Sequence, residues 1–201
     1  MADANLVEAL ERINEIHGHL AKGEIYRGFR PLPIAIAGCG GLLAAWMQPM
    51  WVNAGDAQAF VYYWMAAAAC CAVLAGPLLP FQIWRQNAFD RRRTLRVWGQ
   101  FAPCLAAGGF VGMAIAKALP EAVGLLPGLW SVIFGLGVFS SRPFLPRATG
   151  WIALYYLMAG TWMMLHPQSD SSPAWPLAIT FAVGQMVGGI VLYINRERDN
   201  G

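Results

Sequence analysis

The sequence contains six apolar stretches of roughly 20 residues each, the length of helix that crosses a hydrocarbon core about 30 Å thick. Short polar segments separate them. Only 12% of the 201 residues are charged, whereas a soluble domain usually carries about 25%. Too little polar surface is left to cover a water-soluble globule. We therefore expect an all-α fold, a polytopic transmembrane bundle of six helices preceded by a short amphipathic cytoplasmic helix.

The expected organisation has three parts. Residues 1–30 form the cytoplasmic amphipathic helix and a linker, residues 31–195 form the transmembrane domain, and residues 196–201 form a cytoplasmic tail. The predicted spans cover residues 32–52, 59–84, 97–119, 122–140, 148–165 and 175–194.

The basic residues predict the orientation. With six spans both termini lie on the same side, and all but one of the 14 Lys and Arg residues then fall on that side. Because cytoplasmic segments carry the excess of Lys and Arg, this side is cytoplasmic. The exception is Lys117, near the outer end of the third span, where its stem can reach the interface or its charge can serve a function. The net charge of +3 reflects these flanking residues, so no nucleic-acid partner is expected.

The N-terminal segment is a candidate partner surface. Its apolar stripe recurs at alternating steps of four and three residues, as on one face of a helix, and is formed by Leu6, Leu10, Ile13, His17 and Leu20. The other faces are acidic, and an anionic leaflet would repel them, whereas a lipid-binding surface helix is usually basic. We expect this stripe to contact another protein or the protein's own basic loops.

Small residues predict which helices pack closely. Three pairs have the GxxxG spacing that lets helix backbones approach, namely Gly108 with Gly112, Gly124 with Gly128, and Gly184 with Gly188. They indicate packing within the chain or the face of a homodimer. We predict that the third, fourth and sixth spans form the packed centre of the bundle.

Two amides fall inside predicted spans, Gln100 and Gln185. A buried amide in hydrocarbon needs hydrogen-bond partners, so each is expected to bond across helices or to contact a ligand. Gln185 lies beside Gly184 and is predicted to be buried and bonded to a neighbouring helix, with Gln100 as the candidate partner.

The chain offers little for catalysis. Asp and Glu are absent from the middle of every span, and no nucleophile is paired with a base. The four cysteines lie within spans and are expected to pack as small apolar residues. We expect no enzyme, no cofactor and no metal site. The leading interpretation is a non-catalytic accessory, scaffold or sensory component. The alternative is a small-solute transporter or channel, whose path would be lined by Gln100, Gln185, Ser131, Thr161 and Thr180.

Several motifs together resemble a known family. They are YRGFRP at 26–31, QFAPCL at 100–105, LPGLW at 126–130, FGLGVF at 134–139, LPR at 145–147, YYLMAG at 155–160 and FAVGQ at 181–185. The set resembles an uncharacterised family of bacterial six-span integral membrane proteins of about this length. The resemblance implies a multi-pass protein of the bacterial inner membrane. It implies no activity and no site residue, because none is known for the family.

Overall fold

The computed structural model describes residues 31–75, 88–145, 148–167 and 174–198. Within these ranges the chain forms six α-helices and two short 3-10 helices, and no strand. The predicted all-α class is confirmed. The elements are α2 (Pro31–Trp51), α3 (Ala57–Ala75), α5 (Ala88–Ala118), η1 (Pro120–Leu125), α6 (Leu126–Ser140), η2 (Arg142–Phe144), α7 (Thr149–Leu165) and α8 (Trp175–Arg198). The predicted N-terminal helix, with Leu6, Leu10, Ile13, His17 and Leu20, lies outside the described residues.

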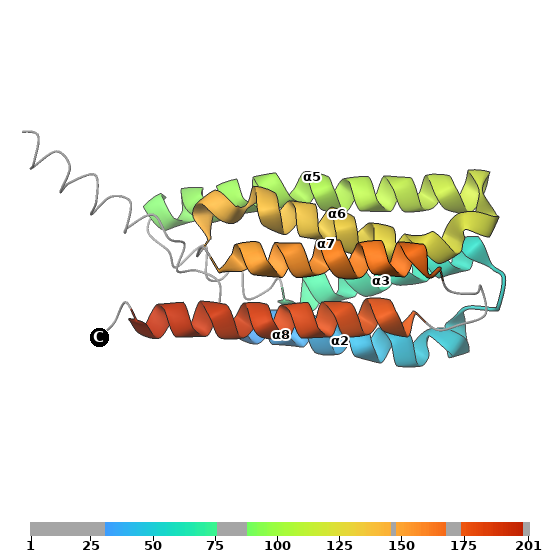
Figure 1. Cartoon of the computed structure of the whole chain (residues 1–201), viewed down its shortest axis with the longest axis horizontal. Helices are drawn as coiled ribbons and strands as arrows, with labels where there is room; N and C mark the ends of the chain where they lie inside the picture. Colours follow the sequence, from blue (N-terminus) through green and yellow to red (C-terminus); the bar gives the residue numbers. More distant parts are fainter. Residues whose placement is uncertain (1–30, 76–87, 146–147, 168–173, 199–201) are drawn as a thin grey trace, which may run out of the picture.

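The six α-helices run side by side along one axis (Figure 1). One end of the bundle, here called the η1 end, holds η1 and the tight turn between α2 and α3. That turn contains Gly55 at φ +84°, a left-handed conformation that glycine adopts without steric cost. Asp56 then starts α3, because its Oδ1 accepts a hydrogen bond from Ala59 N at 2.8 Å. The opposite end, the η2 end, holds η2 and the C-terminal end of α8 (Figure 1).

The bounds predicted for the apolar stretches match the observed helices closely in two cases. α2 and α7 begin and end within one residue of the predicted first and fifth spans. α5, in contrast, begins at Ala88 and not near residue 97, so most of the predicted basic loop is helical. Arginine is a good helix former. A run of charge therefore marks the edge of an apolar stretch without ending the helix, and α8 likewise continues past residue 194 to Arg198.

The predicted fourth span is not one helix, and this correction has a local cause. The chain forms η1 over Pro120–Leu125 and then starts α6 at Leu126. Pro127 lies in the first turn of α6, where its missing N–H costs nothing and its fixed φ suits a helix start. The same missing N–H removes one helical hydrogen bond at the point where η1 gives way to α6.

The helices pair unequally. α6 and α7 have the most extensive contact, followed by α2 and α8, while α5 packs on α6 and α3 packs less extensively on α5. Of the three spans predicted to form the centre, α5 and α6 pack on each other, whereas α8 packs mainly on α2 and less extensively on α7 and α6. The prediction did not include α2 or α7 among the helices that pack closely through glycines.

Two helical stretches among the described residues are long and apolar enough to cross a membrane, Gly99–Ala118 and Pro120–Ser140. Trp175–Val191 is a shorter apolar helix. By length and composition alone, these stretches are consistent with a membrane protein.

Candidate functional site

Glycines bring the backbones of α6 and α7 close together. A Cβ added to Gly128 would lie 2.6 Å from Gly160 O, and a Cβ added to Gly160 would lie 2.7 Å from Gly128 O. Both distances are far below van der Waals contact, and the obstructing atoms belong to the backbone, which cannot rotate away. Two turns further along α6, and one turn earlier in α7, a Cβ on Gly135 would lie 3.0 Å from Tyr156 Cβ. Glycines on both helices therefore allow this extensive contact.

Gly184 and Gly188 have different environments although both were predicted to share one packing face. Gly184 is buried, and a Cβ there would collide with the ring of Tyr156, which is itself fully buried. A Cβ on Gly188 would meet Ile152 Cδ1 at 3.7 Å, an ordinary contact. The close approach of α8 to α7 therefore depends on Gly184 and not on Gly188.

Gly108 and Gly112 of α5 lie against one side chain of α6. A Cβ on Gly112 would lie 3.1 Å from Trp130 Cζ2, and one on Gly108 would lie 3.5 Å from Trp130 Cδ1. The indole Nε1 of Trp130 donates to Gly108 O at 3.0 Å. The two glycines thus form a seat for an indole ring, and the backbones themselves stay further apart than those of α6 and α7.

Gly124 is half-buried in η1, before the first residue of α6. Because the helix breaks between Gly124 and Gly128, their spacing of four residues does not place them on one helical face. The predicted GxxxG pair is not a pair in the structure.

The two predicted amides do not meet. Gln100 is exposed on α5, and Gln185 is half-buried on α8. The structure shows no hydrogen bond between them, nor from either one to another described residue. Gln185 instead lies over α2, where a Cβ on Gly38 would be 3.3 Å from Gln185 Cβ. The predicted Gln185–Gln100 bond is wrong because α5 and α8 do not pack along their lengths.

Four rings fill the space where α5, α6, α7 and α8 meet. Phe134 lies at their centre, with its ring centroid 5.0 Å from that of Phe101 and 4.8 Å from those of Tyr156 and Phe181. Such edge-to-face pairs contribute about 0.5–1.5 kcal/mol beyond the area they bury. The sequence prediction missed this aromatic cluster, which brings one ring from each of the four helices together.

Sequence reasoning also missed Gln48, near the end of α2. Its side chain is only 6% exposed. Its Oε1 accepts two hydrogen bonds, one from Trp64 Nε1 of α3 at 3.2 Å and one from Ala174 N, directly before α8, at 2.9 Å. One amide oxygen thus links three helices at the η1 end and satisfies a backbone N–H at the start of α8.

The described residues contain no group of three His, Cys, Asp or Glu side chains that could hold a metal ion. The cysteines are free, with Cys39 and Cys70 exposed and Cys71 and Cys104 half-buried. Cys71 Sγ lies close against α2, where a Cβ on Gly40 would be 2.6 Å away. The protein is thus an all-α bundle whose helices are held together by close glycine contacts, an aromatic cluster and a buried amide.

No protein-family model, curated protein or solved structure matches this chain. The resemblance to the bacterial six-span family stays a prediction from sequence motifs.

Proposed function

We propose that this chain is a six-span integral protein of the bacterial inner membrane, with both termini cytoplasmic. In this proposal it acts as a non-catalytic accessory, scaffold or sensory component through contacts with other helices. The lipid bilayer is its solvent, and its partner is another membrane protein or a second copy of itself.

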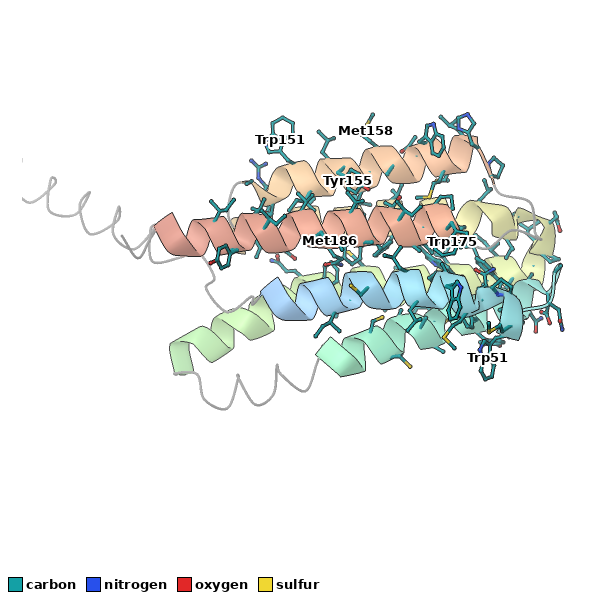
Figure 2. All side chains as sticks on the ribbon, turned by 90° about the horizontal axis from the view of Figure 1, so that it is seen from below. Trp51, Trp151, Tyr155, Met158, Trp175 and Met186 are labelled. Carbon is teal, nitrogen blue, oxygen red and sulfur yellow. The ribbon has the colours of Figure 1, made fainter. Side chains whose placement is uncertain are left out.

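The observation that carries the proposal is that α7 has no charged residue on any face and exposes large apolar side chains on its outer face. Its inner face buries Tyr156 among other residues, while Trp151, Met158 and Leu165 on the outer face are 75%, 65% and 73% exposed. Figure 2 shows Trp151 and Met158 pointing away from the bundle. Thr149–Leu165 contains no charged residue. A helix that is apolar all round is buried in a large core or in a membrane, and nothing in the described chain covers this outer face.

Exposed aromatic residues support the same reading. Trp51 and Trp175 lie toward the η1 end of the bundle, and Trp151 lies toward the η2 end (Figure 2). Tryptophan is enriched at both membrane–water interfaces, where its ring is apolar and its N–H is hydrated. Exposed tryptophans toward both ends of the helices are typical of a bundle that spans a membrane.

The placement of the polar side chains favours a helix-contact component over a solute path. Ser131 is fully buried and donates to Pro127 O of its own helix at 2.9 Å. Thr161 is exposed and donates to Leu157 O at 2.8 Å, and Gln100 is exposed on another helix. These groups do not converge on one channel, and the aromatic cluster occupies the meeting point of four helices. The transporter or channel remains the second candidate.

Cysteine accessibility tests the spanning topology. In a variant without native cysteines, Ala54→Cys places a thiol in the exposed turn between α2 and α3, and Ser140→Cys places an isosteric thiol at the exposed end of α6. We expect a membrane-impermeant maleimide to label residue 54 in intact spheroplasts and residue 140 only after permeabilisation. Labelling of both positions from the same side would contradict the proposed topology.

Capture of partners tests the functional part. We expect crosslinking in native membranes to join the full-length chain to a membrane protein or to itself, and deletion of residues 1–23 to abolish that product without loss of the membrane-embedded protein. Leu10→Glu should act like the deletion, and Glu11→Gln, on the acidic side, is the matched control. A purified protein that moves a solute into liposomes would support the transporter instead.

A further inference from the structure

α5 forms one edge of the bundle (Figure 1), and no described residue covers its outer face. The helix packs on α6 and, less extensively, on α3 and η1. Of its apolar stretch, Gly99–Ala118, 17% is buried, compared with 39% of Pro120–Ser140. Five exposed residues share the outer face of α5, namely Gln100, Pro103, Ala107, Ala114 and Ala118.

Two polar groups lie on this face, toward the η2 end. Gln100 is exposed, and no described residue forms a hydrogen bond with its side-chain amide. Pro103 lies inside α5 and has no N–H, so the carbonyl of Gly99, four residues earlier, loses its helical hydrogen bond. In membranes, a neighbouring helix or ordered water satisfies the carbonyl that a proline frees. The face therefore offers a partner helix both donors and acceptors.

The spacing of the exposed residues suits a parallel helix. Gln100, Ala107 and Ala114 recur at intervals of seven residues, the repeat that keeps one seam of a helix against a parallel neighbour. Alanine is small enough to let two backbones approach closely within a membrane. One polar residue in such a seam specifies the register of the pair, a role that the amide of Gln100 can fill and that a lipid chain cannot use.

A second copy of the chain matches this face by symmetry. Two copies with the same orientation in a membrane are related by a two-fold axis along the membrane normal, which places each residue opposite its own counterpart. An amide carries N–H donors and a carbonyl acceptor, so two facing Gln100 side chains are complementary to each other and to the freed Gly99 carbonyls. Residues 99–116 carry no charge. Lys117 lies about 100° around the helix from Gln100, so the pairing does not force two ammonium groups together.

We propose that the outer face of α5 is a self-association surface, on which two copies pair in parallel along Gln100, Ala107 and Ala114. The Gln100 amides bond to each other across the two-fold axis. This inference rests on the proposed spanning topology, which gives both copies the same orientation, and it identifies the partner as a second copy of the chain.

Disulfide crosslinking of the full-length protein in native membranes tests which face is paired. In a variant without native cysteines, Ala107→Cys places a thiol on the proposed seam. Ala102→Cys is the matched control, because residue 102 is also exposed but lies about 140° around the helix from residue 107. We expect an oxidant to join the Ala107→Cys chains into dimers and to leave the Ala102→Cys chains monomeric. Equal crosslinking at the two positions, or none at residue 107, would overturn the proposed face.

Sedimentation equilibrium of the full-length protein in detergent tests the amide. One interhelical hydrogen bond in a membrane protein changes an equilibrium by a factor of about 2.8. Gln100→Leu removes such a bond from both copies, so the dissociation constant of the dimer should rise about eight-fold. Thr161→Val, which removes an exposed hydroxyl from α7, should leave the constant unchanged. An unchanged constant in Gln100→Leu refutes the role of the amide, provided that its helix content equals that of the wild type.

Carbonate extraction of the membranes separates these outcomes from failure of the proposed topology. A chain released by carbonate fails as a membrane-spanning protein. A chain that stays embedded, sediments as a monomer and gives no Ala107→Cys dimer keeps the proposed topology and refutes only the self-association surface, whose outer face is then covered by lipid.

Discussion

Replacing Gln48 by leucine should destabilise the protein by removing two hydrogen bonds with one change. Leucine has a similar size but no acceptor, so Trp64 Nε1 and Ala174 N both lose their partner. Both residues are buried, at 8% and 1% exposure. Measured interhelical hydrogen bonds in membrane proteins average about 0.6 kcal/mol and reach about 1.7. Two of them predict a loss of roughly 1–3 kcal/mol in the free energy of unfolding.

The assay is reversible unfolding in mixed micelles, in which the denaturing detergent is titrated and helix content is followed by circular dichroism. Gln185→Leu is the matched control, because it makes the same chemical change in another helix where no hydrogen bond to a described residue is lost. We expect that control to stay within about 0.5 kcal/mol of the wild type, the usual range for a change that breaks no specific contact.

A double-mutant cycle isolates the indole bond. Trp64→Phe removes the Nε1 donor and keeps a ring, so the coupling energy between Gln48→Leu and Trp64→Phe should be about 0.6 kcal/mol. The reasoning is refuted if Gln48→Leu is as stable as the wild type, or if Gln185→Leu costs as much as Gln48→Leu.

Three further changes test the packing by the same unfolding assay. Gly184→Ala should cost about 1–3 kcal/mol, as overpacking does, because its Cβ would collide with Tyr156, whereas Gly188→Ala should be neutral or stabilise by up to about 1 kcal/mol through helix propensity; equal effects would contradict the contrast. Gly160→Ala should lower stability more than Gly188→Ala, since two of the three nearest obstructing atoms, Gly128 O and Val132 N of α6, belong to the backbone. Trp130→Phe should cost about 0.6–1.7 kcal/mol for its lost bond to α5, and deep-ultraviolet Raman spectra of the wild type should show a hydrogen-bonded indole that the variant lacks.

The sequence predicted the helices well because their signal is local. An apolar stretch of membrane length specifies a helix without reference to the rest of the chain, as α2 and α7 illustrate. The one broken span also has a local signal, since Pro127 follows Pro120 by only seven residues and starts a new helix.

The pairing of the helices could not be predicted from local sequence, because it depends on which residues of another helix lie against each helix face. Gly160 has no glycine four residues away, so no spacing motif reveals it, yet it lies directly against Gly128. Gly188 has the motif and meets only Ile152. GxxxG spacing identifies a helix face without bulky side chains. Whether another helix packs closely on that face depends on the residues of the other helix.

Gln48 shows the same limit for polar groups. Its partners lie 16 and 126 residues away in the chain. It lies near the end of an apolar stretch, where a polar residue is common and does not by itself indicate a buried hydrogen bond. The amides that the sequence did single out, Gln100 and Gln185, were chosen for their depth in a span and not for a neighbour that could accept or donate.

The hydrogen bond between Gln48 and Ala174 also bears on the order in which the helices can pair during synthesis. α2 leaves the ribosome first among the described helices and α8 leaves last, yet each is the other's main neighbour. α6 and α7 can pair as soon as both are synthesised, whereas the face of α2 that carries Gly38 stays without its α8 partner until synthesis reaches α8. A chain truncated before α8 therefore keeps only the Trp64 bond to Gln48 and leaves the α8-facing side of α2, the first described helix, uncovered, a feature by which proteases can distinguish an unfinished chain from a finished one.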